Sequence, residues 1–306
     1  MYVIKPILLI QKFKIMKSIV YILITVFISS ILISAFPKSV RKEKQIVTIQ
    51  CVNENYSPDI LIKSADIIKA RLKDYGIQNA DVFVDHKASC IDISIDSQVE
   101  LVDVTNLLTS KGSVEFYETY DRLEVIKNLG VEKDLASILN IPSDEKKIDG
   151  CTGIYGYCKE DKKSEVELYL KKHYASKPGH GINFYWSEQP NDNKDFQLFL
   201  LQSNASLDNS YISKSVVKND LSGKKPELMV SFNESGKSIW KDITKRNIGK
   251  SIAIVMDKKV LQAPIVKSEI IEGKCIITGD FSINEINRIN SLINNEELPL
   301  EFKLKN

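Results

Sequence analysis

The sequence lacks the short motifs with which many enzymes bind phosphate, metal ions or dinucleotides. It contains no HExxH motif, no paired-cysteine metal motif, no nucleophile elbow and no dinucleotide fingerprint. Two Gly-Lys-Ser tripeptides begin at Gly236 and Gly249, but Ser231 and Thr244 stand where a phosphate-binding loop needs its earlier glycine. We therefore predict no cofactor and no catalytic residue.

Histidine, cysteine and excess charge are also scarce. The three histidines (His86, His173 and His180) lie far apart, so we predict no metal site. A net charge of +2 argues against a nucleic-acid binder, which normally carries a strong basic excess. Of five cysteines only Cys151 and Cys158 are close together, and their spacing matches no common zinc signature. The two cysteines could form a disulfide or remain as two free thiols, and the sequence leaves both alternatives open.

Long hydrophobic runs are absent, with one exception near the N-terminus. Ser18 to Phe36 are 19 residues without a charge, and lysines precede them. A helix of this length rises roughly 28 Å, close to the thickness of a bilayer core. We expect a single uncleaved anchor in the lipid bilayer of the inner (plasma) membrane, with the bulk of the chain extracytoplasmic. The alternatives are a cleaved signal peptide and a start at Met16 rather than Met1.

Residues 45–120 predict a compact α+β unit. Strand patterns cover 45–52, 80–85, 90–96 and 113–120, and helix patterns cover 58–75 and 97–112. Ser57 suits the cap of the first helix, Pro58 its first position, and Gly76 the residue after its end. The order β-α-β-β-α-β is typical of a ferredoxin-like unit.

The second part of the chain predicts another α+β unit. Residues 121–193 carry the least regular pattern, and strand character resumes with Phe184, Tyr185 and Trp186. These aromatics could line a polypeptide-binding groove, although packing in a core explains such residues more often. Near the end, Ser282 and Glu285 predict a capping box at the start of the last helix.

The stretch 250–266 predicts a β-hairpin rather than an active site. Two apolar runs flank Asp257, Lys258 and Lys259, which we expect to form the turn. The carboxylate of Asp257 can accept hydrogen bonds from nearby backbone N–H groups. Pro264 is expected at an edge or at the end of the second strand, because proline cannot donate to a sheet.

Residues 228–304 closely resemble the first extracytoplasmic (periplasmic) domain of the SecD and SecDF family, in particular SecDF of the Bacteroidetes type. The upstream helix around Arg71 and the strand around Phe116 are similar to the family too. The residues that carry the family motif are Asn233, Gly236, Thr244, Asn247, Gly249, Asp257, Pro264, Gly279, Phe281 and Pro299.

The resemblance implies a fold, an organisation and a role. It implies an α+β fold with a ferredoxin-like base subdomain (residues 45–120 and 290–306) and an α+β head subdomain (121–289, with a variable insertion 121–193). Residues 1–44 precede them as a basic segment with one N-terminal membrane helix. The implied role is that of a non-catalytic accessory domain of Sec-dependent protein export. Its implied partners are unfolded preprotein and the membrane subunits of the Sec translocon.

The chain also departs from the family pattern. The later membrane helices of the family have no counterpart, so the resemblance to a truncated form does not imply proton-driven activity. Lys258 replaces the usual glycine after the hairpin aspartate, which predicts a changed turn, and Glu296 or Glu297 replaces another glycine. Two alternatives therefore stay open: a divergent paralogue that acts as an envelope scaffold, and an unrecognised hydrolase.

Overall fold

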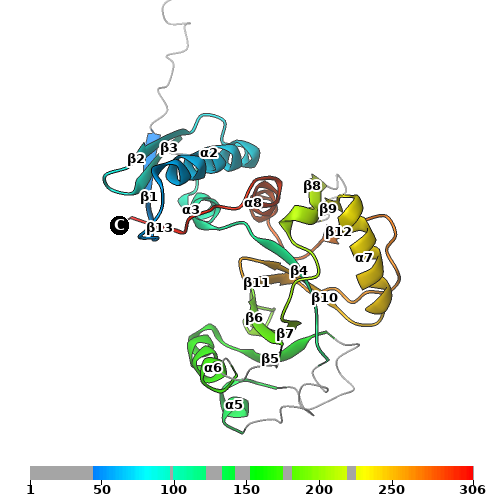
Figure 1. Cartoon of the computed structure of the whole chain (residues 1–306). Coiled ribbons are helices and arrows are strands. Elements are labelled where there is room, and N and C mark those ends of the chain that lie inside the picture. Colours follow the sequence, from blue (N-terminus) through cyan, green and yellow to red (C-terminus); the bar gives the residue numbers. More distant parts are fainter. Residues whose placement is uncertain are drawn as a thin grey trace, which may run out of the picture. The chain divides into compact units, whose positions relative to one another are not determined.

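The computed structural model describes residues 44–96, 99–121, 133–141, 152–174, 181–218 and 225–305. Lys44–Asn306 form one compact unit that is distinct from Met1–Glu43. The described residues combine helices with three sheets (Figure 1), so the predicted α+β class is confirmed. In this part of the chain no helix is long and apolar enough to cross a membrane. The anchor predicted at 18–36 lies outside the described residues.

The first sheet has four antiparallel strands, with two helices packed against it (Figure 1). Its strands, in spatial order, are β13 (Phe302–Leu304), β1 (Lys44–Cys51), β3 (Cys90–Asp96) and β2 (Asp81–Asp85); its helices are α2 (Pro58–Tyr75) and α3 (Leu101–Thr109). As predicted, the alternation in β3 buries Ile91, Ile93 and Ile95. Helix α2 begins at Pro58, and Gly76 follows its end with a φ of +112°, a conformation that glycine adopts without strain. Ser57 occupies the N-cap position, but its side chain makes no capping hydrogen bond.

The strand predicted to complete the ferredoxin-like unit lies in another sheet. β4 (Val114–Glu118) pairs with β10 (Ile252–Met256), and β13 from the C-terminus takes the place beside β1. The reason is that β4 is buried on both faces. Phe116 packs in the core of the first and third sheets, and Tyr117 packs in a separate cluster on the second sheet. An edge strand of the first sheet would bury only one of these two rings.

The second sheet has six strands in the order β4-β10-β11-β6-β7-β5. Its further strands are β5 (Ile154–Cys158), β6 (Ile182–Ser187), β7 (Phe196–Gln202) and β11 (Lys259–Gln262). Two helices, α5 (Lys133–Ile138) and α6 (Glu160–His173), lie at β5–β7 (Figure 1). Leu135, Val166 and Leu170 of this helical layer are buried against Leu198 and Leu200 of β7, which fixes the layer on one face of the sheet.

The third sheet has three strands and shares its core with the first. Its order is β12 (Lys274–Ile277), β9 (Glu227–Phe232) and β8 (Ile212–Lys218), with the short 3-10 helix η1 (Asn209–Tyr211) before β8. Helix α7 (Glu234–Arg246) packs on β9, and α8 (Ile283–Asn294) contacts β8, α2 and α3. Ile286, Ile289 and Leu292 of α8 are buried in a hydrophobic cluster that contains residues of both sheets. The predicted capping box of Ser282 and Glu285 at the start of α8 is confirmed.

The predicted hairpin is present, with a shorter turn than expected. β10 and β11 pair antiparallel, and only Asp257 and Lys258 lie between them. Their φ angles are +48° and +64°, which is the left-handed pair of a type I′ turn. Lys258 thus adopts a positive φ, a conformation that a glycine favours.

Candidate functional site

Asn233 and Gly236 form the start of α7 against η1. The Asn233 Oδ1 atom accepts a hydrogen bond from the Gly236 N–H at 2.9 Å, and its Nδ2 donates to the Ser210 carbonyl at 2.9 Å. A Cβ atom at Gly236 would come within 2.8 Å of the Tyr211 carbonyl oxygen. The first part of the motif therefore caps a helix and lets a loop pass close to it.

Thr244, Asn247 and Gly249 stabilise the other end of α7. The buried Thr244 hydroxyl donates to the Trp240 carbonyl at 2.8 Å and accepts from the Ile270 N–H at 3.0 Å. Asn247 Nδ2 donates to Glu118 Oε2 at 2.6 Å. Gly249 has a φ of +84° with open space around its Cα, so conformation rather than crowding explains the glycine.

Glu118 joins β4 to this end of α7. Its carboxylate accepts from Arg246 Nε at 3.0 Å and from Arg246 Nη2 at 2.5 Å, besides Asn247. Burial by itself raises the pKa of the Glu118 carboxyl, but the hydrogen bonds from Arg246 and Asn247 outweigh it and lower the pKa below its ordinary value. Glu118 is therefore a buried anion that stabilises the contact between β4 and the end of α7 through Arg246 and Asn247.

Asp257 accepts hydrogen bonds from a segment distant in sequence. Its carboxylate accepts from the N–H groups of Gly112 at 3.0 Å and Ser113 at 2.9 Å, between α3 and β4. Its own N–H donates to the Ser113 carbonyl at 3.0 Å. The turn thus fastens the hairpin to the chain that connects the first sheet with the second, a role that sequence reasoning did not reveal.

Arg71 lies at the same junction and was not predicted as a site residue. Its guanidinium is fully buried and donates to the carbonyl oxygens of Ser110 and Lys111 at 2.7 Å, and of Glu296 at 2.8 Å. Burial lowers the pKa of Arg71 to about 10, while the nearby carboxylates of Asp257 and Glu297 oppose the shift, so the side chain is charged at neutral pH. It binds the segment that leaves the first sheet before β4 and the segment that returns to it after α8.

The remaining motif residues shape loops. A Cβ at Gly279 would lie 2.7 Å from the ring of Phe281, which is buried. Pro299 is exposed between two buried leucines. The Pro264 carbonyl accepts from the Ile252 N–H at 3.2 Å, and its ring lies in an extended segment after β11. None of these residues brings titratable groups together.

The three candidate groove aromatics divide between the two faces of β6. Phe184 and Trp186 pack with the helical layer of α5 and α6, and the Trp186 indole donates to Glu167 at 2.9 Å. Tyr185 lies on the opposite face, where its ring packs edge-to-face on Tyr117 at 5.8 Å. All three rings are at least half-buried by these contacts, and none lines the two clefts described next.

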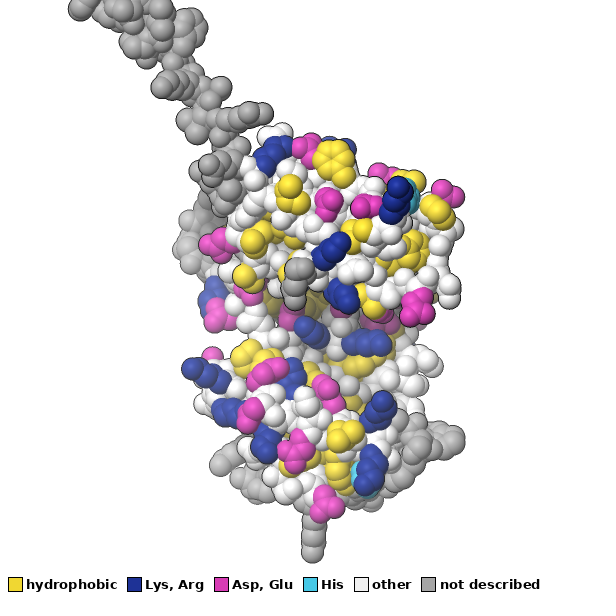
Figure 2. Space-filling model, turned by 90° about the vertical axis from the view of Figure 1, so that its left-hand side faces the viewer, with side chains coloured by type: hydrophobic (Ala, Val, Ile, Leu, Met, Phe, Trp, Pro, Cys, Tyr) yellow, Lys and Arg dark blue, Asp and Glu magenta, His cyan; other side chains and the backbone are white. Residues whose placement is uncertain are grey.

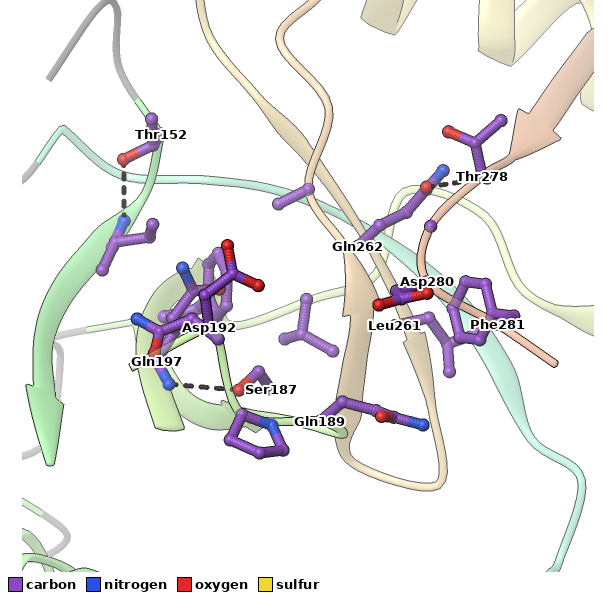
Figure 3. A pocket seen from close by; sticks show the side chains of 17 residues that line it. Thr152, Ser187, Gln189, Asp192, Gln197, Leu261, Gln262, Thr278, Asp280 and Phe281 are labelled. Atoms are coloured by element: carbon purple, nitrogen blue, oxygen red, sulfur yellow. Dashed lines mark hydrogen bonds between the residues drawn. The ribbon is translucent and has the colours of Figure 1, made fainter. Parts of the chain in front are cut away.

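The first cleft lies on the second sheet, beside the loop that follows β12. It has a volume of about 590 Å³ (Figure 3). Ser187 and Gln197 line it, and the Gln197 N–H donates to the Ser187 hydroxyl at 3.1 Å. Gln262 reaches across to the segment after β12, where its Oε1 accepts from the Thr278 N–H at 3.0 Å (Figure 3). Asp192 and Asp280 supply its charged groups.

A second cleft of about 540 Å³ lies between the chain that follows β11 and the third sheet. Its lining is more apolar and includes Met229, Trp240, Ile265 and Ile276. Ile265 and Ile276 are 36% and 46% exposed, so apolar side chains remain in contact with solvent here. On the face drawn in Figure 2, basic and acidic side chains are interspersed.

The described residues contain no group of histidine, cysteine and acidic side chains that could hold a metal ion. Cys158 is buried with a free thiol, and Cys151 lies outside the described residues, so the disulfide alternative is not borne out. Burial raises the pKa of the Cys158 thiol to about 11 and that of Cys275 to about 12. Neither thiol is a reactive nucleophile near neutral pH.

Part of the described chain matches a known protein family. Residues 185–300 match the family model for SecDF, P1 head subdomain. This part of the chain is similar to the P1 head subdomain of SecDF. Every motif residue from Asn233 to Pro299 falls within the matched range, as do both clefts apart from Thr152 and Ile154 of the first.

Curated proteins similar to this chain include SecD subunits. The protein translocase subunit SecD of Rickettsia typhi is 29% identical over 163 residues, which are 53% of this chain and 30% of the relative. The SecD subunit of Rickettsia prowazekii is 39% identical over 98 residues, which are 32% of this chain and 19% of the relative. The chain thus spans less than a third of the length of these relatives.

Solved SecDF structures share the fold beyond the P1 head. A structure described as a membrane component SecDF that enhances protein export is 16% identical with a TM-score of 0.50, covering 86% of this chain and 98% of that chain. SecDF in a super-membrane-facing form is 16% identical with a TM-score of 0.54, covering 94% of this chain and 34% of that chain. At this identity the likeness concerns the fold alone.

Proposed function

We propose that this chain is a SecD-like, non-catalytic accessory domain of protein export that binds unfolded polypeptide on the extracytoplasmic side of a membrane. Its curated relatives are named protein translocase subunits, and a solved structure of similar fold is described as enhancing protein export. The Sec translocon is the second partner that we propose. The domain organisation proposed with this role is a base of residues 45–120 and 290–306 and a head of residues 121–289.

The first cleft is the observation that best supports binding of a polypeptide. It is open and mixes polar amides and hydroxyls with the apolar side chains of Phe199 and Val260. Apart from Thr152 and Ile154, its lining falls in the range similar to the P1 head subdomain. Its charged groups, Asp192 and Asp280, are exposed, and Lys225 pairs with Asp280. A hydrolase would need convergent titratable groups in a closed pocket, whereas a chain of varied sequence needs an adaptable surface.

We propose that residues 18–36 attach the domain to a lipid bilayer. Their length and lack of charge support this role, and a bilayer anchor would keep the binding surface close to the exit of a translocon. Fractionation of cells that express the full chain tests the anchor. Release of the chain by alkaline carbonate would contradict it, and removal of residues 18–36 should cause such release.

Co-purification tests the export role. The tagged full chain should recover translocon subunits together with a preprotein arrested during export. Recovery of neither component would overturn the proposal. Normal export in a strain that lacks the gene, with crosslinks only to other envelope proteins, would favour the scaffold alternative.

A further inference from the structure

The edge of the second sheet is open beside β11. β11 pairs with β6 only at Lys259 and Val260, opposite Trp186 and Ser187, and a last hydrogen bond joins the Glu188 N–H to the Val260 carbonyl at 2.8 Å. Beyond this point the chain of β6 turns away into the loop that leads to β7. The strand edge after Val260 therefore has no partner strand in the described part of the chain.

The main-chain groups of Ala263 and Ile265 point toward this open side. The Pro264 carbonyl accepts from the first N–H of β10 at 3.2 Å, and the Val266 N–H donates to the Lys250 carbonyl at 2.9 Å. Successive residues of a strand direct their main-chain groups to opposite sides, so those of Ala263 and Ile265 face away from β10. Within the described residues, no hydrogen bond engages the main chain of either residue.

Other strand edges in this region are capped by side chains. The Trp240 indole donates to the Lys274 carbonyl of β12 at 3.1 Å, and Gln262 Nε2 donates to the Ile276 carbonyl at 3.1 Å. On β8, Asn294 both donates to and accepts from the main chain of one residue. Natural proteins cover strand edges to prevent pairing with other chains. The segment from Ala263 to Ile265 lacks such a cover.

The two clefts border this same segment. Ala263 lines the first cleft, and Pro264 and Ile265 line the second. The clefts differ in charge. The first presents Asp192 and Asp280, of which Asp280 pairs with Lys225, and the second presents three lysines with one glutamate. An extended chain along the segment would meet an acidic end and a basic, apolar end.

We propose that an extended segment of unfolded polypeptide adds to this edge as a strand and bonds to the main chain of Ala263 and Ile265. This inference rests on the proposed function and names the recognition mode of the same head. Recognition through the main chain tolerates many sequences, because every residue except proline offers the same N–H and C=O groups. Charge complementarity favours segments with lysine or arginine toward the first cleft and acidic residues toward the second.

A matched pair of variants in the full chain tests the edge. Ile265→Pro removes the outward N–H, and Ile265→Ala removes the same side chain but keeps that donor. The fold does not use this N–H, and proline is tolerated at such edge positions, so both variants should fold, as circular dichroism can verify. Loss of one hydrogen bond predicts binding about three- to tenfold weaker in Ile265→Pro than in Ile265→Ala.

The probes are a fluorescent peptide of alternating valine and threonine and the same peptide with alternate amides N-methylated. Fluorescence anisotropy should show binding of the first and at least about tenfold weaker binding of the second, since several strand hydrogen bonds are lost. Equal binding of both peptides, or equal affinity of the two Ile265 variants, overturns strand addition and leaves the export role in place. If neither peptide binds, and a reduced, carboxymethylated unfolded protein does not bind either, then polypeptide binding itself is overturned.

Discussion

Replacement of Arg71 by methionine should destabilise the whole described unit. The guanidinium donates to three carbonyl oxygens, two before β4 and one after α8, and it is fully buried. Methionine keeps most of the aliphatic length but leaves these three acceptors without a donor in a buried place. It also leaves the carboxylate of Asp257 without its nearby positive charge.

The expected magnitude follows from the loss of one partner in a buried charged network. Such a loss costs about 3–5 kcal/mol, against a total stability of about 5–15 kcal/mol for a typical domain. For a unit of this size, about 2 °C of melting temperature corresponds to 1 kcal/mol, so we expect a decrease of about 6–10 °C. The conservative Arg71→Lys should recover only part of it, because an ammonium cannot reproduce the planar fork that reaches all three carbonyls.

Thermal and urea unfolding of the purified chain, followed by circular dichroism, measure the effect. Lys73→Met is the matched control, because it removes a positive charge from an exposed position of the same helix. The reasoning would be refuted if the melting temperatures of Arg71→Met and Lys73→Met differed by less than about 2 °C. A difference of that size corresponds to only about 1 kcal/mol. It would show that the carbonyls find other donors once the guanidinium is gone.

Three further measurements address other parts of the described unit. Gly236→Ala should lower the stability by about 1–3 kcal/mol in urea unfolding, because its Cβ would meet the Tyr211 carbonyl; Ser238→Ala on the exposed side of α7 is the control. The stabilising effect of ionised Glu118 should be present above the pKa of an unfolded glutamate and be lost as the pH falls through its lowered folded value. Stability measured from pH 7 down to pH 3 should therefore fall more steeply in the wild type than in Glu118→Gln. Cys275 should resist maleimide at pH 8 in the folded chain and react in urea, as mass spectrometry of its peptide can show.

Contrary results would be informative for each of them. Unchanged stability in Gly236→Ala would show that η1 can move away from α7. Parallel pH profiles would show that Glu118 has the same proton affinity in the folded and unfolded chains. Rapid labelling of folded Cys275 would indicate that β12 opens at the second cleft.

Local patterns predicted the elements whose signals depend on near neighbours in sequence. The alternating isoleucines of β3, the glycine after α2, the capping box of α8 and the β10–β11 hairpin all follow from residues a few positions apart. The family motif was also recognisable, because several of its residues support a helix end, a turn or a close approach. The contacts of these residues are consistent with maintenance of the fold.

Long-range partners decided the rest. The sequence of β4 is compatible with the first sheet or the second, and only the burial of both Phe116 and Tyr117 places it in the second. The bonds from Asp257 to Gly112 and Ser113 join residues 145 and 144 positions apart, so no local pattern could indicate them. From sequence alone, Arg71 would be expected on the surface of its helix. In the structure it donates to three carbonyl oxygens that are distant in sequence.

The open edge at Ala263 shows the same division most clearly. The sequence by itself determined two strands, a turn at Asp257 and a proline that ends regular pairing, because steric and hydrogen-bonding preferences act over a few residues. An irregular register between Ile254 and Val255 changes which main-chain groups point outward. Whether those groups meet a partner depends on where β6 ends, which only the packing of the sheets decides. The tertiary structure therefore determined the surface that we propose for polypeptide binding.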